Sequence, residues 1–108
     1  MEILFTLFFL LLAGHWLADY PLQGDFLATA KQKGPLRVYH LIAHSGIHGA
    51  FVMIITGSWI LGLTEWIAHT IIDELKVRGK TTFAVDQILH IACKWAYVTI
   101  IAIGAFYG

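Results

Sequence analysis

The sequence contains little charge, two prolines and one cysteine. The single cysteine, Cys93, excludes an internal disulfide. Charged residues make up only 13% of the 108 residues and hydrophobic residues 58%, so a soluble fold would have too little polar surface to cover itself. The net charge is zero, which argues against a basic surface for nucleic acid. With a mean hydropathy of +0.73, the composition indicates an integral membrane protein whose main partner is the lipid bilayer.

Four apolar stretches have close to the ~20 residues that a helix needs to cross a bilayer. Pro21 is expected to end the first, because proline cannot continue helical hydrogen bonding. Gly57 and Ser58 leave room only for a tight turn between the second and third, which makes those helices antiparallel neighbours. The predicted fold class is therefore all-α: a single polytopic membrane domain (1–108) with a four-helix antiparallel transmembrane bundle, its spans at about 3–20, 38–56, 59–77 and 84–107.

Six of the seven basic residues lie in two of the connections between these spans. The positive-inside rule places both connections in the cytoplasm and both termini outside. Residues 22–33 follow the first span and form either a short amphipathic helix at the cytoplasmic interface or a plain loop. The six basic residues are Lys31, Lys33 and Arg37 in the first connection, and Lys76, Arg78 and Lys80 in the second.

Every histidine has a potential metal ligand four residues away, within an apolar stretch. Residues at i and i+4 share a helix face, so each pair points two polar side chains in one direction. Burying such groups in a membrane costs much free energy, so they are retained there only when they have partners or a function. The order reverses from His-then-Asp to Asp-then-His where the helix direction reverses, as one shared site requires. The groups are His15/Asp19, His40/His44/His48, His69/Asp73 and Asp86/His90.

This residue set favours a transition metal, with zinc as the expected ion. Neutral imidazoles bind such metals, and aspartates serve as ligands or hold the other ring nitrogen. One or two ions fit the number of donors. His40 is expected to meet only headgroups, and His48 lies deeper than the other histidines. The predicted ligands are His15, His44, His48, His69, Asp73 and His90.

Two alternatives use the same histidines without a transition-metal site. The polar side chains could form a purely structural hydrogen-bond network between helices. Bis-histidine haem ligation is the other reading, and the three partnered aspartates argue against it.

Glu65 and Lys94 each extend a polar helix face by one further step toward the middle of the bilayer. An isolated charge there is costly, so the two are predicted to form an ion pair. The pair has either a structural role, fixing the helix register, or a catalytic one.

Four segments resemble an uncharacterised family of small bacterial and phage integral membrane proteins that carries a domain-of-unknown-function label. They are HWLADYPLQ (15–23), the histidines at 40, 44 and 48, HTIIDELK (69–76) and DQILH (86–90). The resemblance covers nearly the whole chain and extends, more distantly, to inner-membrane proteins described as metal-dependent hydrolases. It implies a bacterial inner-membrane location and metal binding at His15, Asp19, His69, Asp73, Asp86 and His90.

The expected function is a membrane-embedded, metal-dependent hydrolase that opens to the cytoplasm. Asp19 or Asp86 would act as general base at the mouth of the site. Lys76 and Arg78 would attract a phosphorylated lipid or other anion. A metal-ion or proton carrier and a non-catalytic membrane factor remain the alternatives, and a homo-oligomer is open because no motif decides it.

Overall fold

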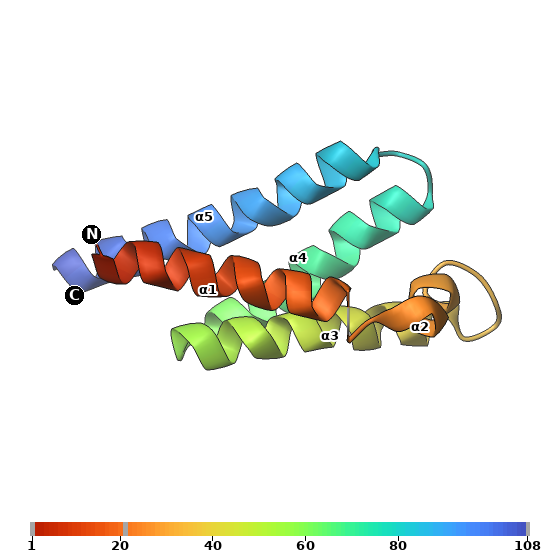
Figure 1. The fold of residues 1–108 in the computed structure, drawn as a ribbon, viewed down its shortest axis with the longest axis horizontal. Coiled ribbons are helices and arrows are strands. Elements are labelled where there is room, and N and C mark those ends of the chain that lie inside the picture. Colours follow the sequence, from red (N-terminus) through yellow and green to blue (C-terminus); the bar gives the residue numbers. More distant parts are fainter. Residues whose placement is uncertain (1, 21, 108) are drawn as a thin grey trace.

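The computed structural model describes residues 2–20 and 22–107, with the side chains of 105–107 outside the description. Five helices follow one another along the chain (Figure 1), which confirms the all-α prediction. The four long ones begin and end within one residue of the predicted spans. Pro21, predicted to end the first helix, lies outside the described residues. The helices are α1 (Glu2–Asp19), α2 (Gly24–Ala30), α3 (Arg37–Thr56), α4 (Trp59–Val77) and α5 (Phe83–Tyr107).

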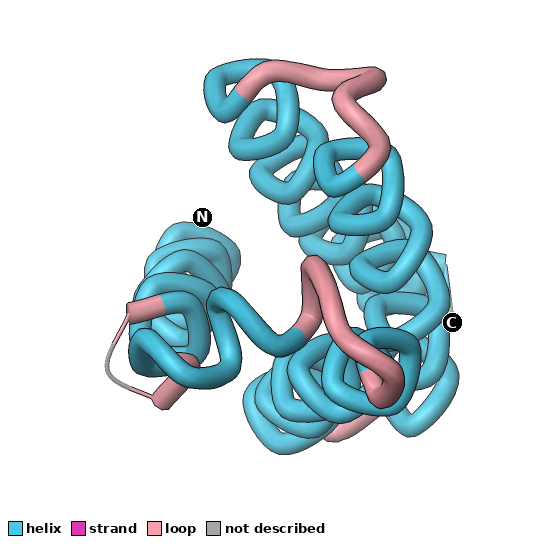
Figure 2. Tube along the Cα trace, turned by 90° about the vertical axis from the view of Figure 1, so that its right-hand side faces the viewer, coloured by secondary structure: helices cyan, strands magenta, loops and turns pink. Residues whose placement is uncertain are grey.

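The four long helices form a closed ring in which each helix runs antiparallel to its two neighbours. Both α1 and α4 pack against α3 and against α5 (Figures 1 and 2). The bundle is 47 Å long. Helix α1 begins and α5 ends at one end of it, whereas α2 lies at the other end beside α3 (Figure 1).

Three helices, rather than the four predicted, are long and apolar enough to cross a membrane: α1, α3 and the part of α5 from Phe83 to Gly104. Helix α4 has the length but carries Glu65, Asp73, Glu74 and Lys76, so its composition alone does not mark a span. The prediction of four apolar spans therefore holds for three.

The bundle is polar inside and apolar outside, the reverse of a soluble fold. Among the described residues, ten polar or charged side chains are buried, against eight hydrophobic ones. Large apolar side chains on every long helix face outward, such as Phe5 (72% exposed), Ile54 (74%) and Ile88 (63%). A surface of this kind suits lipid and would be an aggregation hazard in water.

The tight turn predicted between the second and third spans is confirmed. Helix α3 ends at Thr56, and Gly57 adopts a left-handed conformation (φ 73°), which a glycine reaches without strain. The Ser58 hydroxyl then caps α4 by accepting a hydrogen bond from the Leu61 amide.

Gly49 of α3 and Gly62 of α4 allow these two helices to approach closely. A Cβ on Gly49 would lie 2.8 Å from the Gly62 carbonyl oxygen, and one on Gly62 would lie 2.9 Å from the Gly49 oxygen. Only residues without side chains fit this crossing.

A short helix, α2, occupies the first basic connection, so the helical alternative for 22–33 is correct and the plain loop is not. It covers Gly24–Ala30, less than the predicted segment, and Phe26 is 73% exposed on it. Its position at a membrane interface stays a prediction.

We expect Gly49→Ala to lower the free energy of unfolding by about 1–3 kcal/mol, because the added methyl group would push α3 and α4 apart. The control is Gly104→Ala on α5, where no described atom lies within 4 Å of the Cβ position. That change should be neutral or stabilising by up to about 1 kcal/mol. Unfolding by sodium dodecyl sulfate in mixed micelles measures both variants, and equal effects would contradict the close crossing.

Candidate metal centre

Five of the six histidines meet in one cluster between the four long helices. The His69 ring stacks between two others, with centroids 3.7 Å from His48 and 4.1 Å from His90. The His15 centroid lies 5.0 Å from that of His48, and His44 lies 4.8 Å from His48. Each of the five is at most 2% exposed. Histidines from α1, α3, α4 and α5 thus form one buried layer.

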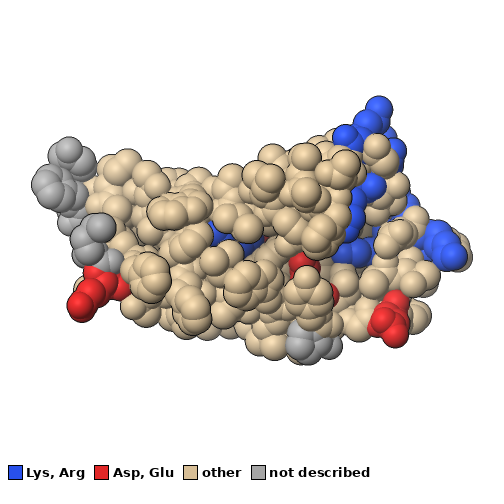
Figure 3. Space-filling model, turned by 45° about the horizontal axis from the view of Figure 1, so that its top comes forward, with Lys and Arg blue, Asp and Glu red and all other residues tan. Residues whose placement is uncertain are grey.

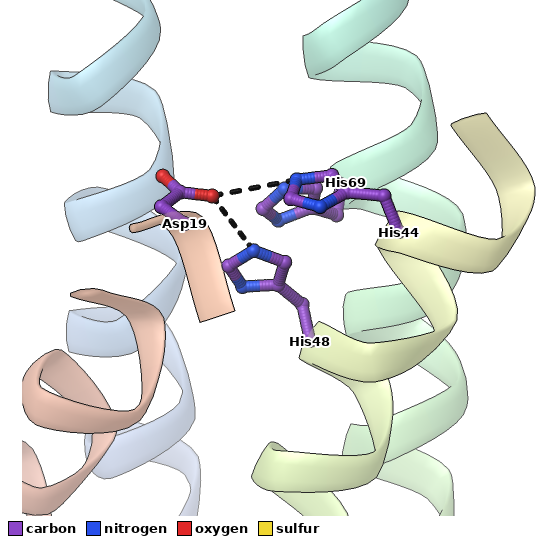
Figure 4. A group of neighbouring side chains, drawn as sticks. All are labelled: Asp19, His44, His48 and His69. Atoms are coloured by element: carbon purple, nitrogen blue, oxygen red, sulfur yellow. Dashed lines mark hydrogen bonds and ion pairs between the residues drawn. The ribbon is translucent and has the colours of Figure 1, made fainter. Parts of the chain in front are cut away.

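Asp19, at the end of α1, contacts three of these histidines. Its Oδ1 accepts a hydrogen bond from His48 Nε2 at 2.9 Å and lies 3.4 Å from His44 Nε2 (Figure 4). Its Oδ2 lies 3.3 Å from His15 Nε2. The two carboxylate oxygens therefore face different histidines.

Asp73 of α4 is shared in the same way. Its Oδ2 lies 3.4 Å from the Nε2 atoms of both His44 and His69, and its Oδ1 lies 3.2 Å from His90 Nε2. The Lys31 ammonium donates to Oδ2 at 3.2 Å, so a positive charge already sits against this carboxylate.

Asp86 of α5 lies at the edge of the cluster. Its Oδ1 is 3.6 Å from His90 Nε2, and its Oδ2 accepts a hydrogen bond from the Gln87 amide at 3.1 Å. Gln87 Oε1 is in turn 3.2 Å from His15 Nε2, so this residue links Asp86 to the histidine layer.

A cavity of about 100 Å³ adjoins the aspartates at the basic end of the bundle. Figure 3 shows basic side chains gathered at this end, with acidic atoms recessed beside them. Lys76 lines the cavity, whereas Arg78 does not and instead pairs with Glu74 through its Nε at 2.8 Å. The lining residues are Asp19, Tyr20, Gln23, Lys31, Asp73, Lys76, Phe83, Asp86 and Gln87.

Glu65 lies on the opposite side of the histidine layer and connects it to Lys94. Its Oε2 accepts hydrogen bonds from Lys94 Nζ at 2.9 Å and from His69 Nδ1 at 3.0 Å, while its Oε1 accepts one from the Tyr97 hydroxyl at 2.9 Å. The two residues predicted to pair are therefore in contact. A carboxylate only accepts, so Glu65 favours the neutral tautomer in which Nδ1 of His69 carries the ring proton, and that tautomer has a lone pair on Nε2.

The side chains around this lone pair fit a cation. Within the described part of the chain, His69 Nε2 and His44 Nε2 are buried without a hydrogen-bond partner, although carboxylate oxygens lie 3.4 Å away. A carboxylate–histidine contact behind a free ring nitrogen is the usual support of a metal ligand. Three groups bring donor atoms within 4.8 Å of one another: Asp19/His44/His48/His69, His15/His69/His90 and Asp73/Asp86/His90.

The distances between these donor atoms also suit a metal. Tetrahedral or octahedral ions with ligand bonds of ~2.0–2.2 Å hold neighbouring donors roughly 2.9–3.5 Å apart. The contacts of Asp19 and Asp73 with histidine Nε2 atoms fall between 2.9 and 3.4 Å. The buried histidines and aspartates can therefore hold a metal ion.

Each residue predicted as a ligand lies in this cluster, together with Asp19 and Asp86. His48 joins the cluster because its ring stacks on His69, and its greater depth stays a prediction. His40 lies apart, against the rings of Phe26 and Tyr39. The ligand predictions comprise His15, His44, His48, His69, Asp73 and His90.

Sequence reasoning missed three residues of the site: Lys31, Gln87 and Tyr97. Gln87 and Tyr97 belong to none of the histidine–histidine or histidine–aspartate pairs at i, i+4, so the pattern could not select them. Tyr97 follows Lys94 by one helical turn, which is the only local signal for it. The sequence predicts Lys31 to lie in a basic connection, and only the path of α2 brings its ammonium onto Asp73.

The fold and the site define a class: a helical protein with segments able to cross a membrane and a buried histidine–aspartate cluster able to bind metal. The chain belongs to the protein family of unknown function DUF3307, whose family model matches residues 7–106. That range contains the whole cluster, and it agrees with the resemblance to an uncharacterised family. No curated protein and no solved structure matches the chain.

We expect Glu65→Gln and Lys94→Met each to destabilise the fold by about 3–5 kcal/mol, because each leaves its partner charged and buried. The double variant should recover much of this loss in the same unfolding titration. The metal affinity of the double variant should nevertheless be about 10–100-fold lower than that of the wild type, since a neutral amide is a weaker hydrogen-bond acceptor for His69 Nδ1 than a carboxylate. Full recovery of metal affinity would show that Glu65 has a structural role alone.

Proposed function

We propose that the protein is a membrane-embedded, metal-dependent hydrolase that acts on an anionic substrate. A phosphorylated lipid is the first candidate for this substrate. One observation carries this proposal: a buried histidine–aspartate cluster adjoins a cavity whose lining includes Lys31 and Lys76. Metal ligands beside an opening with basic side chains suit hydrolysis of an anion near the membrane surface.

The proposal places all four long helices in the bilayer, including α4. Its polar residues Glu65 and His69 are buried in the bundle, whereas Ile60 (57%) and Ile67 (56%) are exposed on the opposite face. A helix with this division can span a membrane despite its charges, because lipid meets only the apolar face.

The proposed location is a bacterial inner membrane, with the cavity toward the cytoplasm. Basic residues gather at the end of the bundle that holds α2 and the connection between α4 and α5 (Figure 3). The positive-inside rule assigns that end to the cytoplasm and the opposite end, where α1 begins, to the outside.

The other end of the bundle argues against a carrier that uses the same ligands. There Leu11, Val52, Leu61 and Val98 pack into an apolar core with Tyr97. A carrier needs a polar route on both sides of its binding site. Beyond Glu65 and Lys94, the described side chains buried at this end are mostly apolar. The arrangement favours a site served from one side.

Asp86 is better placed than Asp19 to act as general base. Both aspartates line the cavity, but Asp19 contacts three histidines, whereas Asp86 lies only beside His90, at 3.6 Å, and its Oδ1 has no hydrogen-bond partner among the described residues. Gln87 donates to the other oxygen, and from its place between the cavity and His90 the carboxylate would take a proton from water at the metal site.

A bound divalent ion, with zinc the expected one, supplies a Lewis acid that polarises the scissile group. Lys31 and Lys76, both in the cavity lining, attract and orient the anionic part of the substrate. Arg78 is left out of this role because it lies outside the cavity and pairs with Glu74.

Thiol labelling tests the orientation in a Cys93→Ser background. We expect Glu2→Cys, exposed at one end of the bundle, to react with a membrane-impermeant maleimide in intact spheroplasts. Gln32→Cys, exposed at the basic end, should react only after the membrane is opened, because the positive-inside rule places it in the cytoplasm. The reverse pattern would refute the orientation.

Phosphate release tests the hydrolase itself. The zinc-loaded protein should release phosphate from phosphatidic acid in mixed micelles, and chelation should abolish the release. Asp86→Asn should lower kcat by at least about 100-fold with bound zinc unchanged, because the base is lost. His40→Ala, outside the cluster, should keep full activity. Zinc uptake into proteoliposomes without any phosphate release would favour the carrier instead.

A further inference from the structure

We infer that the histidine–aspartate cluster is a dinuclear centre, in which Asp19 and Asp73 bridge two metal ions. This inference deepens the proposed function and rests on metal binding at the same site, although not on the hydrolytic step.

The two oxygens of Asp19 point to separate sets of histidines. Oδ1 is 2.9 Å from His48 Nε2 and 3.4 Å from His44 Nε2, both on α3. Oδ2 is 3.3 Å from His15 Nε2 on α1. A carboxylate divided in this way can bind one ion through each oxygen.

Asp73 divides its oxygens between the same two sides. Oδ2 is 3.4 Å from His44 Nε2, which Asp19 also contacts, and 3.4 Å from His69 Nε2. Oδ1 is 3.2 Å from His90 Nε2, and the His90 ring lies 5.1 Å from that of His15. His44 thus touches one oxygen of each aspartate, while His15 and His90 lie by the other two.

These contacts define two metal positions. The His44 position has His44, His48 and His69 with Asp19 Oδ1 and Asp73 Oδ2. At the His15 position, Asp19 Oδ2 contacts His15 and Asp73 Oδ1 contacts His90, and the rings of these two histidines lie 5.1 Å apart. Under this inference each position has at least four donors, the number that a zinc or manganese ion needs.

A single ion would leave part of this set of donor atoms without a metal. One ion takes four to about six ligands, whereas the cluster offers five imidazoles and two shared carboxylates. A single ion would leave ring nitrogens buried without a ligand and would use only one oxygen of each aspartate. Two bridging carboxylates hold ions ~3.5–4 Å apart, the spacing of two-metal hydrolytic sites.

Asp86 stays outside the bridges. Its 3.6 Å separation from His90 Nε2 exceeds the distances made by Asp19 and Asp73, and Gln87 holds its second oxygen. Its assignment as general base is therefore compatible with two ions.

Loading with Mn²⁺ alone tests the inference, because manganese suits histidine and carboxylate ligands and reports its neighbours by electron paramagnetic resonance. The detergent-purified wild type should bind two Mn²⁺ per chain and give an exchange-coupled spectrum. His48→Ala and His90→Ala each remove a ligand from a different position, so each should retain one Mn²⁺ with an isolated six-line spectrum. His40→Ala, whose ring lies outside the cluster, is the matched control and should retain two.

The wild-type measurement alone decides the inference even where a variant fails to fold. Saturation at one ion per chain with a six-line spectrum would overturn the dinuclear centre and leave a single-metal hydrolase standing. Failure to bind either Mn²⁺ or Zn²⁺ would overturn both proposals. Two coupled ions without hydrolysis of any phosphate ester would support the dinuclear centre and remove the proposed function.

Discussion

Three carboxylates hold the long helices to one another: Glu65 and Asp73, which are buried and cannot be left unpaired, and Asp19, which is half-buried. Asp19 ties α1 to α3, Asp73 ties α4 to α3 and α5, and Glu65 ties α4 to α5 through Lys94. Removing one partner of such a contact leaves a desolvated charge, which costs far more than an apolar contact of the same area. The outward faces of the helices are apolar and specify no register of their own, so these polar contacts select the arrangement of the ring.

The same constraint produces the layers along the bundle. An apolar core around Leu11 and Val52 fills the end where α1 begins, and the Glu65–Lys94 pair follows it. The histidine layer comes next, then the aspartates and the cavity with its lysines. Polar groups therefore gather toward the end that holds the cavity. This gradient is the physical basis on which we propose an enzyme rather than a carrier.

A structural network and a metal centre use similar side chains, and they differ in how the donors are satisfied. A network that only stabilised the fold would pair each ring nitrogen with a hydrogen-bond acceptor at good geometry. Here Glu65 fixes the proton on the far nitrogen of His69, while the near nitrogen faces the carboxylates without a hydrogen bond among the described residues. A bound cation would recover the energetic cost of that arrangement, which is the reason for proposing a metal centre rather than a purely structural network.

The sequence by itself determined the helices, the i, i+4 polar faces and the tight turn at Gly57, because these depend on local periodicity and on backbone conformation. It also indicated one shared site, since the order of histidine and aspartate reverses where the helix direction reverses. Only the tertiary structure decided which oxygen of Asp19 and Asp73 faces which histidine, that Glu65 supports His69, and that Lys31 reaches the site. These contacts depend on how whole helices are rotated and crossed, and on the path of α2. Packing between segments that are distant in the sequence sets this geometry, and spacing along the chain does not.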